Sequence, residues 1–429
     1  MSATSISPSL SRHSRESGNP GDMGTHIPAS AGMTPAFHRQ PVNSQLSMWW
    51  LTIDRWLLSA LIGLALFGVL VIAAASPAVA ERIGLASTHF LKRHLILLLP
   101  TMAIMIGLSF LSPRGVRRAG LLLFFGALAM LIITPFTGDA IKGATRWVRI
   151  AGFSLQASEF MKPAFAIVVA WMFSMQQKGE GFPGNIVAMG ICVVVASLLL
   201  VQPDLGQTFV LMSIFGVQFF LAGLPILLVV CLGVLGLGGL VGAYFTFPHV
   251  QSRVDRFLDP SSGDTFQVER SLAAFRHGSW FGTGPAQGEV KHQLPDAHAD
   301  FAFSVLGEEM GLIACMLLLM VFAFIVMRGF YRASKQPDLF VLLATSGILT
   351  QFGMQALIHM GSALHLMPTK GMTLPFISYG GSSLISLGIA MGFMLALTRT
   401  KRAIPLNIRF QPNDSDWDAT TADRSEVRS

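Results

Sequence analysis

The sequence predicts an all-α polytopic membrane protein with about ten transmembrane helices and one large extracytoplasmic loop between the seventh and the eighth. Of its 429 residues, 52% are hydrophobic and only 12% are charged, whereas a soluble domain carries about 25% charged residues. The mean hydropathy is +0.58, and apolar blocks near the roughly 20 residues that span a bilayer alternate with short polar loops. This pattern excludes ordinary soluble, disordered and fibrous proteins.

The first 47 residues do not share this pattern. Residues 1–47 are rich in Ser, Pro, Gly and His and contain no apolar run that could act as a signal peptide. We interpret them as a disordered tail or as a segment upstream of the true start, because Met48 opens directly onto the first apolar block. The membrane domain is expected over 48–402, followed by a cytoplasmic tail over 403–429.

The apolar blocks that follow give the ten expected helices. Each block is close to the length that a transmembrane helix needs, and the third, fourth and tenth are short. The blocks lie at 56–76, 94–112, 119–135, 160–176, 185–202, 206–223, 225–245, 302–327, 338–361 and 382–398.

Basic residues fix the expected orientation. They follow the second, eighth and tenth helices, which all end on one side of the membrane, and the positive-inside rule makes that side the cytoplasm. Both termini are then cytoplasmic, and the loop over 246–302 lies outside. The net charge of +7 therefore indicates membrane topology and not nucleic-acid binding. These basic residues are Arg114, Arg117, Arg118, Arg328, Arg332, Lys335, Arg399, Lys401 and Arg402.

The long outer loop ends in the string Leu-Pro-Asp-Ala-His-Ala-Asp-Phe, which runs directly into the eighth helix. Asp300 stands where this loop meets the bilayer, so it is a candidate catalytic carboxylate; the alternative is that it caps the helix. Asp296, His298 and Asp300 alternate along the chain and could chelate a divalent ion if extended. Glu308 and Glu309 lie about two turns deeper, where carboxylates normally face a polar cavity.

A second cluster lies between the third and fourth helices and continues into the fourth. It contains Arg146, Trp147 and Arg149, followed by Glu159 and Lys162, which share one face if the segment is helical. One interpretation is a cationic recess for a phosphate group. The other is that Lys162 begins an apolar span and extends to the membrane interface.

Two further polar strings interrupt the apolar pattern. Asp204 and Gln207 lie between the fifth and sixth helices with the spacing of a capping box, so they are candidates both for a cap and for a substrate contact. The string from Lys370 to Leu384 contains two prolines and three glycines just before the tenth helix. Irregular backbone near membrane depth is tolerated where it lines a cavity, so we expect this string to form a cavity wall.

Together these four strings resemble the SEDS family (shape, elongation, division and sporulation), and its division branch in particular. The most specific match is Lys370–Leu384, Lys-Gly-Met-Thr-Leu-Pro-Phe-Ile-Ser-Tyr-Gly-Gly-Ser-Ser-Leu, and the similarity extends from Trp49 to about Arg402. Two departures are Ala299, where the family usually has Thr, and His359, near a position where Asn is common. The expected fold is therefore the SEDS bundle.

The resemblance implies a peptidoglycan glycosyltransferase that polymerises lipid II into glycan strands during septal cell-wall synthesis. Such proteins lie in the inner (cytoplasmic) membrane of bacteria at the division septum. They work at its outer face with a class B penicillin-binding protein, an FtsI-type transpeptidase, and with other divisome proteins. The family's essential carboxylate maps onto Asp300. A lipid II flippase, an elongation-type polymerase and a division scaffold are the alternatives.

The residues suit glycosyl transfer. Asp300 would accept the proton of the acceptor 4-hydroxyl, and a cation must offset charge on the departing pyrophosphate; Lys162, Arg146 and Arg149 are candidates, with a divalent cation, Mg²⁺ or Mn²⁺, as a further one. The candidate substrate-binding residues are Arg146, Trp147, Arg149, Glu159, Lys162, Asp204, Gln207, His298, Lys370, Ser378, Tyr379, Gly380, Gly381 and Ser382.

Overall fold

The computed structural model describes residues 45–400 apart from 142–143, 151–152, 180, 224–225, 247–250, 253, 256, 258–265 and 369–370. The predicted tails, 1–47 and 403–429, lie outside the described residues except at 45–47. There a short helix, α1 (Gln45–Thr52), begins three residues before Met48. Trp49 of this helix is buried, stacks on Phe110 with ring centroids 4.8 Å apart, and donates a hydrogen bond to Ser109.

A helix lies at each of the ten predicted positions, so the all-helical bundle is confirmed. Six helices in the described part of the chain are long and apolar enough to cross a membrane, and α7 and α13 are shorter apolar helices. The chain is therefore a multi-pass membrane protein. The ten are α2 (Arg55–Arg82), α3 (His89–Ser109), α4 (Pro113–Thr137), α5 (Ala157–Gln177), α6 (Gly184–Val201), α7 (Leu205–Leu221), α8 (Ile226–Thr246), α11 (Ala302–Ser334), α12 (Leu339–Ala363) and α13 (Gly381–Leu397).

Helices α5 and α12 form the centre of the bundle. α12 packs against α5, α7, α11 and α13, and most of its residues are buried inside the protein instead of facing lipid. Phe165 and Phe173 of α5 pack against Phe215 of α7. Because both central helices are enclosed, every polar side chain on them needs a partner within the protein.

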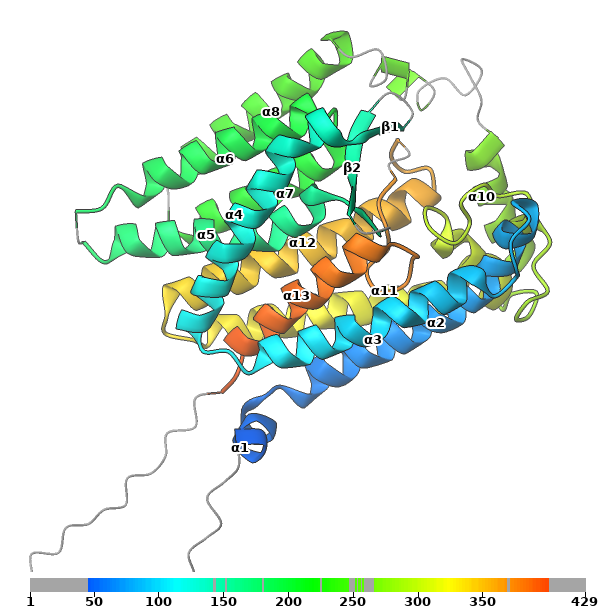
Figure 1. Cartoon of the computed structure of the whole chain (residues 1–429), viewed down its shortest axis with the longest axis horizontal. Coiled ribbons are helices and arrows are strands. Elements are labelled where there is room, and N and C mark those ends of the chain that lie inside the picture. The colour runs from blue at the N-terminus through cyan, green and yellow to red at the C-terminus, as the bar shows by residue number, and fades with distance from the viewer. Residues whose placement is uncertain are drawn as a thin grey trace, which may run out of the picture. The chain divides into compact units, whose positions relative to one another are not determined.

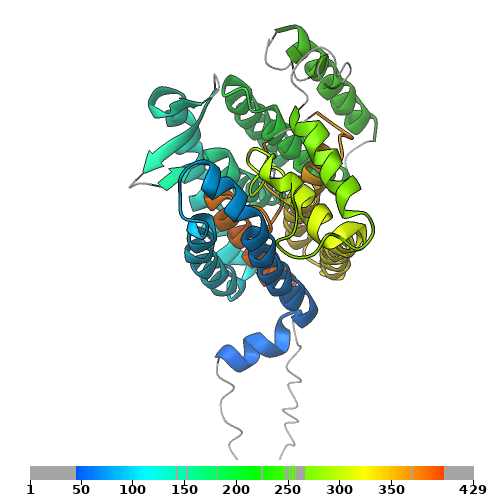
Figure 2. The same cartoon turned by 90° about the vertical axis from the view of Figure 1, so that its right-hand side faces the viewer.

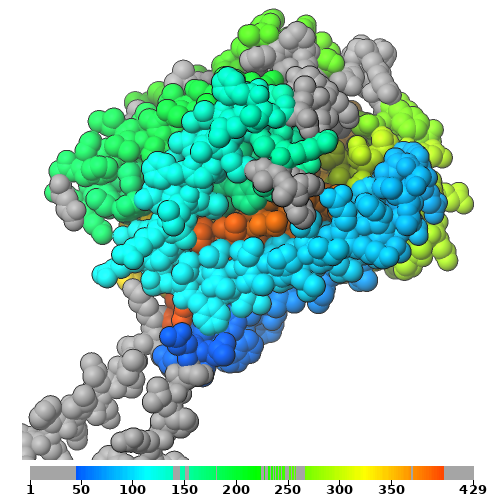
Figure 3. Space-filling view, viewed as in Figure 1, coloured from blue at the N-terminus to red at the C-terminus, as the bar shows by residue number. Residues whose placement is uncertain are grey.

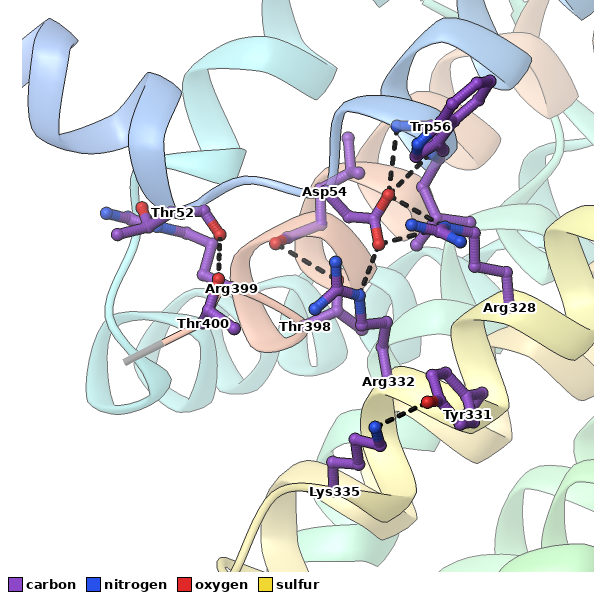
Figure 4. A network of polar contacts seen from close by, with 12 residues as sticks. Thr52, Asp54, Trp56, Arg328, Tyr331, Arg332, Lys335, Thr398, Arg399 and Thr400 are labelled. Carbon is purple, nitrogen blue, oxygen red and sulfur yellow. Dashed lines mark hydrogen bonds and ion pairs between the residues drawn. The ribbon is translucent and has the colours of Figure 1, made fainter. Parts of the chain in front are cut away.

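The basic segments that follow α3, α11 and α13 meet at one end of the bundle, here called the inner end, where α1 also lies (Figure 1). Asp54 caps α2 by accepting from the backbone N–H groups of Trp56 and Leu57. It also accepts hydrogen bonds from Arg328 and Arg332 of α11 (Figure 4). Burial alone would raise the pKa of Asp54, but these hydrogen bonds hold it below its usual range. The predicted gathering of these basic loops on one side is confirmed.

Residues 136–159 carry a small sheet that the sequence analysis did not predict. Strands β1 (Asp139–Ile141), β2 (Ala144–Ile150) and β3 (Phe153–Leu155) pair antiparallel in chain order. The sheet lies at the outer end of the bundle, which we define by β1–β3, helix α10 (Phe266–Gly278) and the short 3₁₀ helix η2 (Val290–His292) (Figures 1 and 2). β2 holds Trp147 opposite Asp139 and Arg149 opposite Ser154, and Arg146 lies at an irregularity in the β1–β2 pairing.

The long outer loop is fastened to α11 by two buried glutamates. Glu308 accepts hydrogen bonds from the backbone N–H groups of Val290 and Lys291, 2.7 and 2.9 Å away, and contacts the ring of His277 at 3.0 Å. Glu309 forms an ion pair with Lys291. The expectation that these carboxylates face a polar cavity is therefore wrong: they satisfy the loop backbone instead.

Gly311 lets the loop insert into α11. Its φ of +78° breaks the helix, and its neighbour Leu312 donates its N–H to the carbonyl of Ser279 in the loop, 3.0 Å away. A side chain at Gly311 would overlap the backbone of Trp280. Only glycine combines this left-handed conformation with such a close approach, so the glycine fixes how the loop that ends at Asp300 docks on the bundle.

Candidate active site at the outer end

Asp300 lies at the outer end of the bundle, beside the glycine-rich string that precedes the tenth predicted helix. Its carboxylate is close to the backbone of Gly371: a Cβ built on that glycine would stand 3.4 Å from Oδ2. The N-cap position of α11 is Phe301, the residue directly after Asp300. The backbone of Tyr379 donates a hydrogen bond of 2.9 Å to the carbonyl of His298. The two predicted strings therefore contact each other, as a shared site requires.

An aromatic cluster surrounds this junction. The ring of His298 lies 4.2 Å from Phe90 and 5.2 Å from Tyr379 between centroids, and Phe90 meets Tyr379 edge-on at 5.3 Å. Burial of His298 lowers its pKa to about 4, which outweighs the opposing effect of Asp296. His298 is therefore neutral at physiological pH.

Glu159 and Lys162 share one face of α5, as predicted, and form an ion pair of 2.9 Å. Lys162 is fully buried, so the interpretation that it extends to the membrane interface is wrong. Its ammonium donates to Gln355 of α12, 3.1 Å away, and Gln355 in turn donates to Thr373 and Ser383. This buried network links the second predicted cluster to the glycine-rich string.

Asp204 joins the third string to the same region. Its side chain accepts from the backbone N–H of Gln207, so the predicted cap forms. It also accepts from Gln156 at 3.2 Å and pairs with Arg146 at 3.9 Å. Burial raises the pKa of Asp204, against the opposing effect of Arg146. Arg146 additionally donates to the carbonyls of Gln202 and Pro203.

Gln207 connects these two groups. Its side-chain amide donates to Glu159 at 2.7 Å, while its backbone N–H donates to Asp204. Five of the predicted substrate-binding residues therefore form one continuous network: Arg146, Glu159, Lys162, Asp204 and Gln207.

The other described residues of the glycine-rich string contact neighbouring parts of the protein. Ser378 is buried and its hydroxyl accepts from the backbone N–H of Leu374, which closes a turn. Gly380 occupies the capping position of α13, and Gly381 lies against Leu97 of α3. Ser382 is buried in the first turn of α13. Lys370 lies outside the described residues.

Trp147 and Arg149 lie on β2, away from the buried network. Trp147 is paired with Asp139 and Arg149 with Ser154 across the sheet, and Arg149 is exposed. Their predicted contact with substrate stays a prediction.

The described residues contain no group of three or more His, Cys, Asp or Glu side chains that could hold a metal ion. Asp296, His298 and Asp300 therefore do not form the chelate that their alternation suggested. A divalent cation, Mg²⁺ or Mn²⁺, stays a prediction, because one or two carboxylates together with substrate phosphates can also hold such an ion.

The sequence analysis missed Gln355, Thr373, Ser383 and Phe90 as site residues. One signal could have found Gln355: Gln351, Gln355 and His359 recur every four residues within an otherwise apolar span, and all three are fully buried. His359 contacts the carbonyl of Met372 at 2.7 Å. This polar face of α12 therefore supports the glycine-rich string from behind.

Comparisons with known proteins agree with this architecture. The family model described as cell cycle protein, FtsW/RodA/SpoVE, matches residues 55–403. The probable peptidoglycan glycosyltransferase FtsW of Caulobacter vibrioides is 46% identical over 373 residues, which cover 87% of this chain and 95% of that protein. The stage V sporulation protein E of Bacillus subtilis is 36% identical over 281 residues, or 64% of this chain and 77% of that protein.

Solved structures share the fold. A chain of a peptidoglycan synthase complex that coordinates polymerisation and crosslinking gives a TM-score of 0.68 at 27% identity, covering 81% of this chain and 98% of that one. The rod shape determining protein RodA of Thermus thermophilus gives 0.59 at 26% identity, covering 81% and 97%. With a family model that spans nearly the whole described chain, this protein belongs to the FtsW/RodA/SpoVE family of cell cycle proteins.

Proposed function

We propose that this protein is a peptidoglycan glycosyltransferase that polymerises lipid II into glycan strands during septal cell-wall synthesis, with Asp300 as the catalytic base. The observation that carries the proposal is that the Asp300 carboxylate lies close to Gly371, at the start of the glycine-rich string. The names of the relatives support the activity and the division role, since the FtsW of Caulobacter vibrioides is a probable peptidoglycan glycosyltransferase.

The proposed reaction needs one base and one or more cations. Asp300 accepts the proton of the acceptor 4-hydroxyl as that oxygen bonds to the anomeric carbon of the donor. The bond from this carbon to the pyrophosphate oxygen breaks, and its electron pair leaves with the pyrophosphate. Because pyrophosphate is already a good leaving group, a second carboxylate of the kind that glycosidases use is unnecessary. A positioned base typically contributes 10²–10⁴-fold to the rate.

A stripe on α13 suits the polyprenyl tail of the substrate. Within this helix only Gly381, Ile385 and Ile389 are not fully buried, and their spacing of four residues puts them on one face. The surface of α13 remains visible between α3 and α4 (Figure 3). The stripe begins next to Tyr379, so a tail along it would bring its headgroup to the outer end.

We also propose the topology, location and partner. The basic inner end faces the cytoplasm by the positive-inside rule, with both termini on that side, and the outer end faces outward at the division septum. A class B penicillin-binding protein of the FtsI type crosslinks the product, in company with other divisome proteins. The similarity to a chain of a peptidoglycan synthase complex supports this pairing.

The decisive experiment measures glycan strands formed from purified lipid II in detergent. The cognate penicillin-binding protein is present with its transpeptidase blocked, and the wild type is compared with Asp300→Asn. Thermal unfolding and partner binding must match between the two. Polymer from the wild type and at least a hundredfold less from Asp300→Asn is expected. Equal polymer from both would overturn the role of Asp300.

A flippase is the main alternative. If neither protein makes polymer while the wild type moves fluorescent lipid II across liposome membranes, the glycosyltransferase proposal is wrong and transport takes its place.

A further inference from the structure

The outer half of α3 turns one face toward the candidate active site. Phe90, Arg93 and Leu97 follow at helical spacing and share that face. Phe90 packs on His298 and Tyr379, and Leu97 lies 3.2 Å from a Cβ built on Gly381. Arg93 stands between these two contacts, so its side chain emerges on the side of Tyr379.

Arg93 carries a charge that no carboxylate of the described residues neutralises. Three other cations of the outer end are each paired with a carboxylate: Lys162 with Glu159, Arg146 with Asp204, and Lys291 with Glu309. Arg93 is exposed, yet its charge acts on the hydroxyl of Tyr379, where it opposes the rise in pKa that burial of the tyrosine causes. An unneutralised guanidinium beside a half-buried tyrosine marks a place suited to an anion.

Arg93 lies in the second turn of α3 from its outer end, next to Lys92, and both side chains are exposed. The ordinary explanation is that an arginine there extends to lipid headgroups. That explanation does not account for the neighbouring aromatic rings and the direction toward Tyr379.

A second observation points to a ligand at the same place. His298 is more than nine-tenths buried, and its Nδ1 has no hydrogen-bond partner among the described residues. An unmade hydrogen bond of a buried group costs about 1–3 kcal/mol. The ring stacks on Phe90, one turn from Arg93, so a ligand bound against this face of α3 is close to both.

We propose that Arg93, beside the rings of Phe90 and Tyr379, binds a phosphate group of the polyprenyl-pyrophosphate substrate. This inference rests on the proposed function, because it names the cation that holds the donor's leaving group. The planar guanidinium of arginine matches two phosphate oxygens at once. Arg93 lies on the Tyr379 side of the string whose other end lies close to Asp300, which suits a cation that receives the departing pyrophosphate.

The test measures binding apart from catalysis. The purified full chain is titrated in detergent with a polyprenyl pyrophosphate and, separately, with the matching polyprenol that lacks phosphate. The variants are Arg93→Gln, Arg93→Lys and the control Lys92→Gln, an exposed neighbour on a different face of the helix. Phosphatidylglycerol serves as competitor, because a bilayer phosphate is the other source of the same chemistry. Polymerisation of lipid II is measured for the same four proteins.

Arg93→Gln should weaken pyrophosphate binding about ten- to a hundredfold, which is the range for a charged hydrogen bond. Arg93→Lys should weaken it less, Lys92→Gln should match the wild type, and polyprenol binding should stay unchanged in all. Unchanged pyrophosphate binding by Arg93→Gln, or displacement by phosphatidylglycerol as effective as by the pyrophosphate itself, would overturn the inference.

The two proposals fail separately. Binding that depends on Arg93 in a protein that makes no polymer would contradict the proposed glycosyltransferase and leave the phosphate site standing. Polymer formation by the wild type and Arg93→Gln at equal KM and kcat would leave the enzyme standing and contradict the phosphate site.

Discussion

The carboxylate of Asp300 lies close to Gly371, although the two residues are 71 positions apart in the sequence: a methyl group built on the glycine would stand 3.4 Å from Oδ2 and 3.8 Å from Oδ1. These distances are ordinary van der Waals contact. A methyl group fits, but a branched side chain would occupy the space of the carboxylate. The glycine therefore sets how much room the proposed base has.

A graded series at Gly371 tests this relationship. Gly371→Ala should keep polymerisation within about threefold of the wild type, whereas Gly371→Val should lower it by about 10²–10⁴-fold, because the base is displaced from its substrate. Lipid II polymerisation measures the effect. Gly63→Val is the matched control, since a Cβ at Gly63 of α2 meets nothing within 4 Å. Full activity of Gly371→Val would contradict the proposed position of the base.

The buried pair of Glu159 and Lys162 should be strongly coupled. Either Lys162→Met or Glu159→Gln alone leaves its partner buried without full compensation, and loss of one partner of a buried pair costs about 3–5 kcal/mol. The double variant should recover much of that stability in thermal unfolding. The partly exposed pair of Arg117 and Asp338, 3.6 Å apart, is the control, where the same cycle should give less than about 1 kcal/mol. Additive losses at the buried pair would show that the two charges act independently.

Much of this architecture could be predicted from the sequence, because a lipid environment imposes long apolar runs with sharp polar boundaries. All ten helices follow from that constraint alone. The network of Glu159, Lys162 and Gln207 could also have been predicted, since polar side chains in buried helices must form hydrogen bonds or ion pairs with one another. The spacing of Glu159 and Lys162 correctly predicted that they share one face of a helix, where the structure shows them as an ion pair.

The outer end could be predicted much less well. Strands β1–β3 are three to seven residues long, too short for periodicity to identify, and they are stabilised by pairing with each other. The role of Glu308 was not predicted for a different reason. Its partners are the backbone N–H groups of Val290 and Lys291, and every residue except proline has such a group. Residue type therefore carried no signal for this contact.

Glu308 should hold the outer loop in place for catalysis. Glu308→Ala leaves the backbone N–H groups of Val290 and Lys291 without their acceptor, at about 1–3 kcal/mol each. We expect faster hydrogen exchange over 266–300 and a loss of polymerisation although Asp300 is intact. Glu289→Ala, an exposed neighbour in the same loop, should change neither. Unchanged exchange in Glu308→Ala would show that the loop docks without this carboxylate.

His298 should make stability depend on pH. Burial lowers its pKa from 6.5 to about 4, so between these values the unfolded chain binds a proton that the folded chain does not. Stability should therefore fall as the pH decreases from about 6.5 to 4, by up to roughly 3 kcal/mol. His298→Phe should flatten this part of the profile in thermal unfolding scans, whereas His292→Gln, an exposed control, should not. Identical profiles for His298→Phe and the wild type would contradict this assignment.

Asp54 should stabilise the inner end without affecting the chemistry at the outer end. Asp54→Asn keeps a side-chain cap for α2 but loses the charge that Arg328 and Arg332 contact (Figure 4); Asp54→Ala loses both, at about 1 kcal/mol more for the cap. Unfolding temperature should fall in the order wild type, Asn, Ala. Because the pKa of Asp54 is held low, the stability difference between the wild type and Asp54→Asn should be largest at neutral pH. It should vanish as acid protonates the carboxylate.

Polymerisation per folded molecule should stay constant in these variants, since Asp54 and Asp300 lie at opposite ends of the bundle. A fall in kcat at unchanged folding would instead reveal that the inner end is coupled to the site where Asp300 acts.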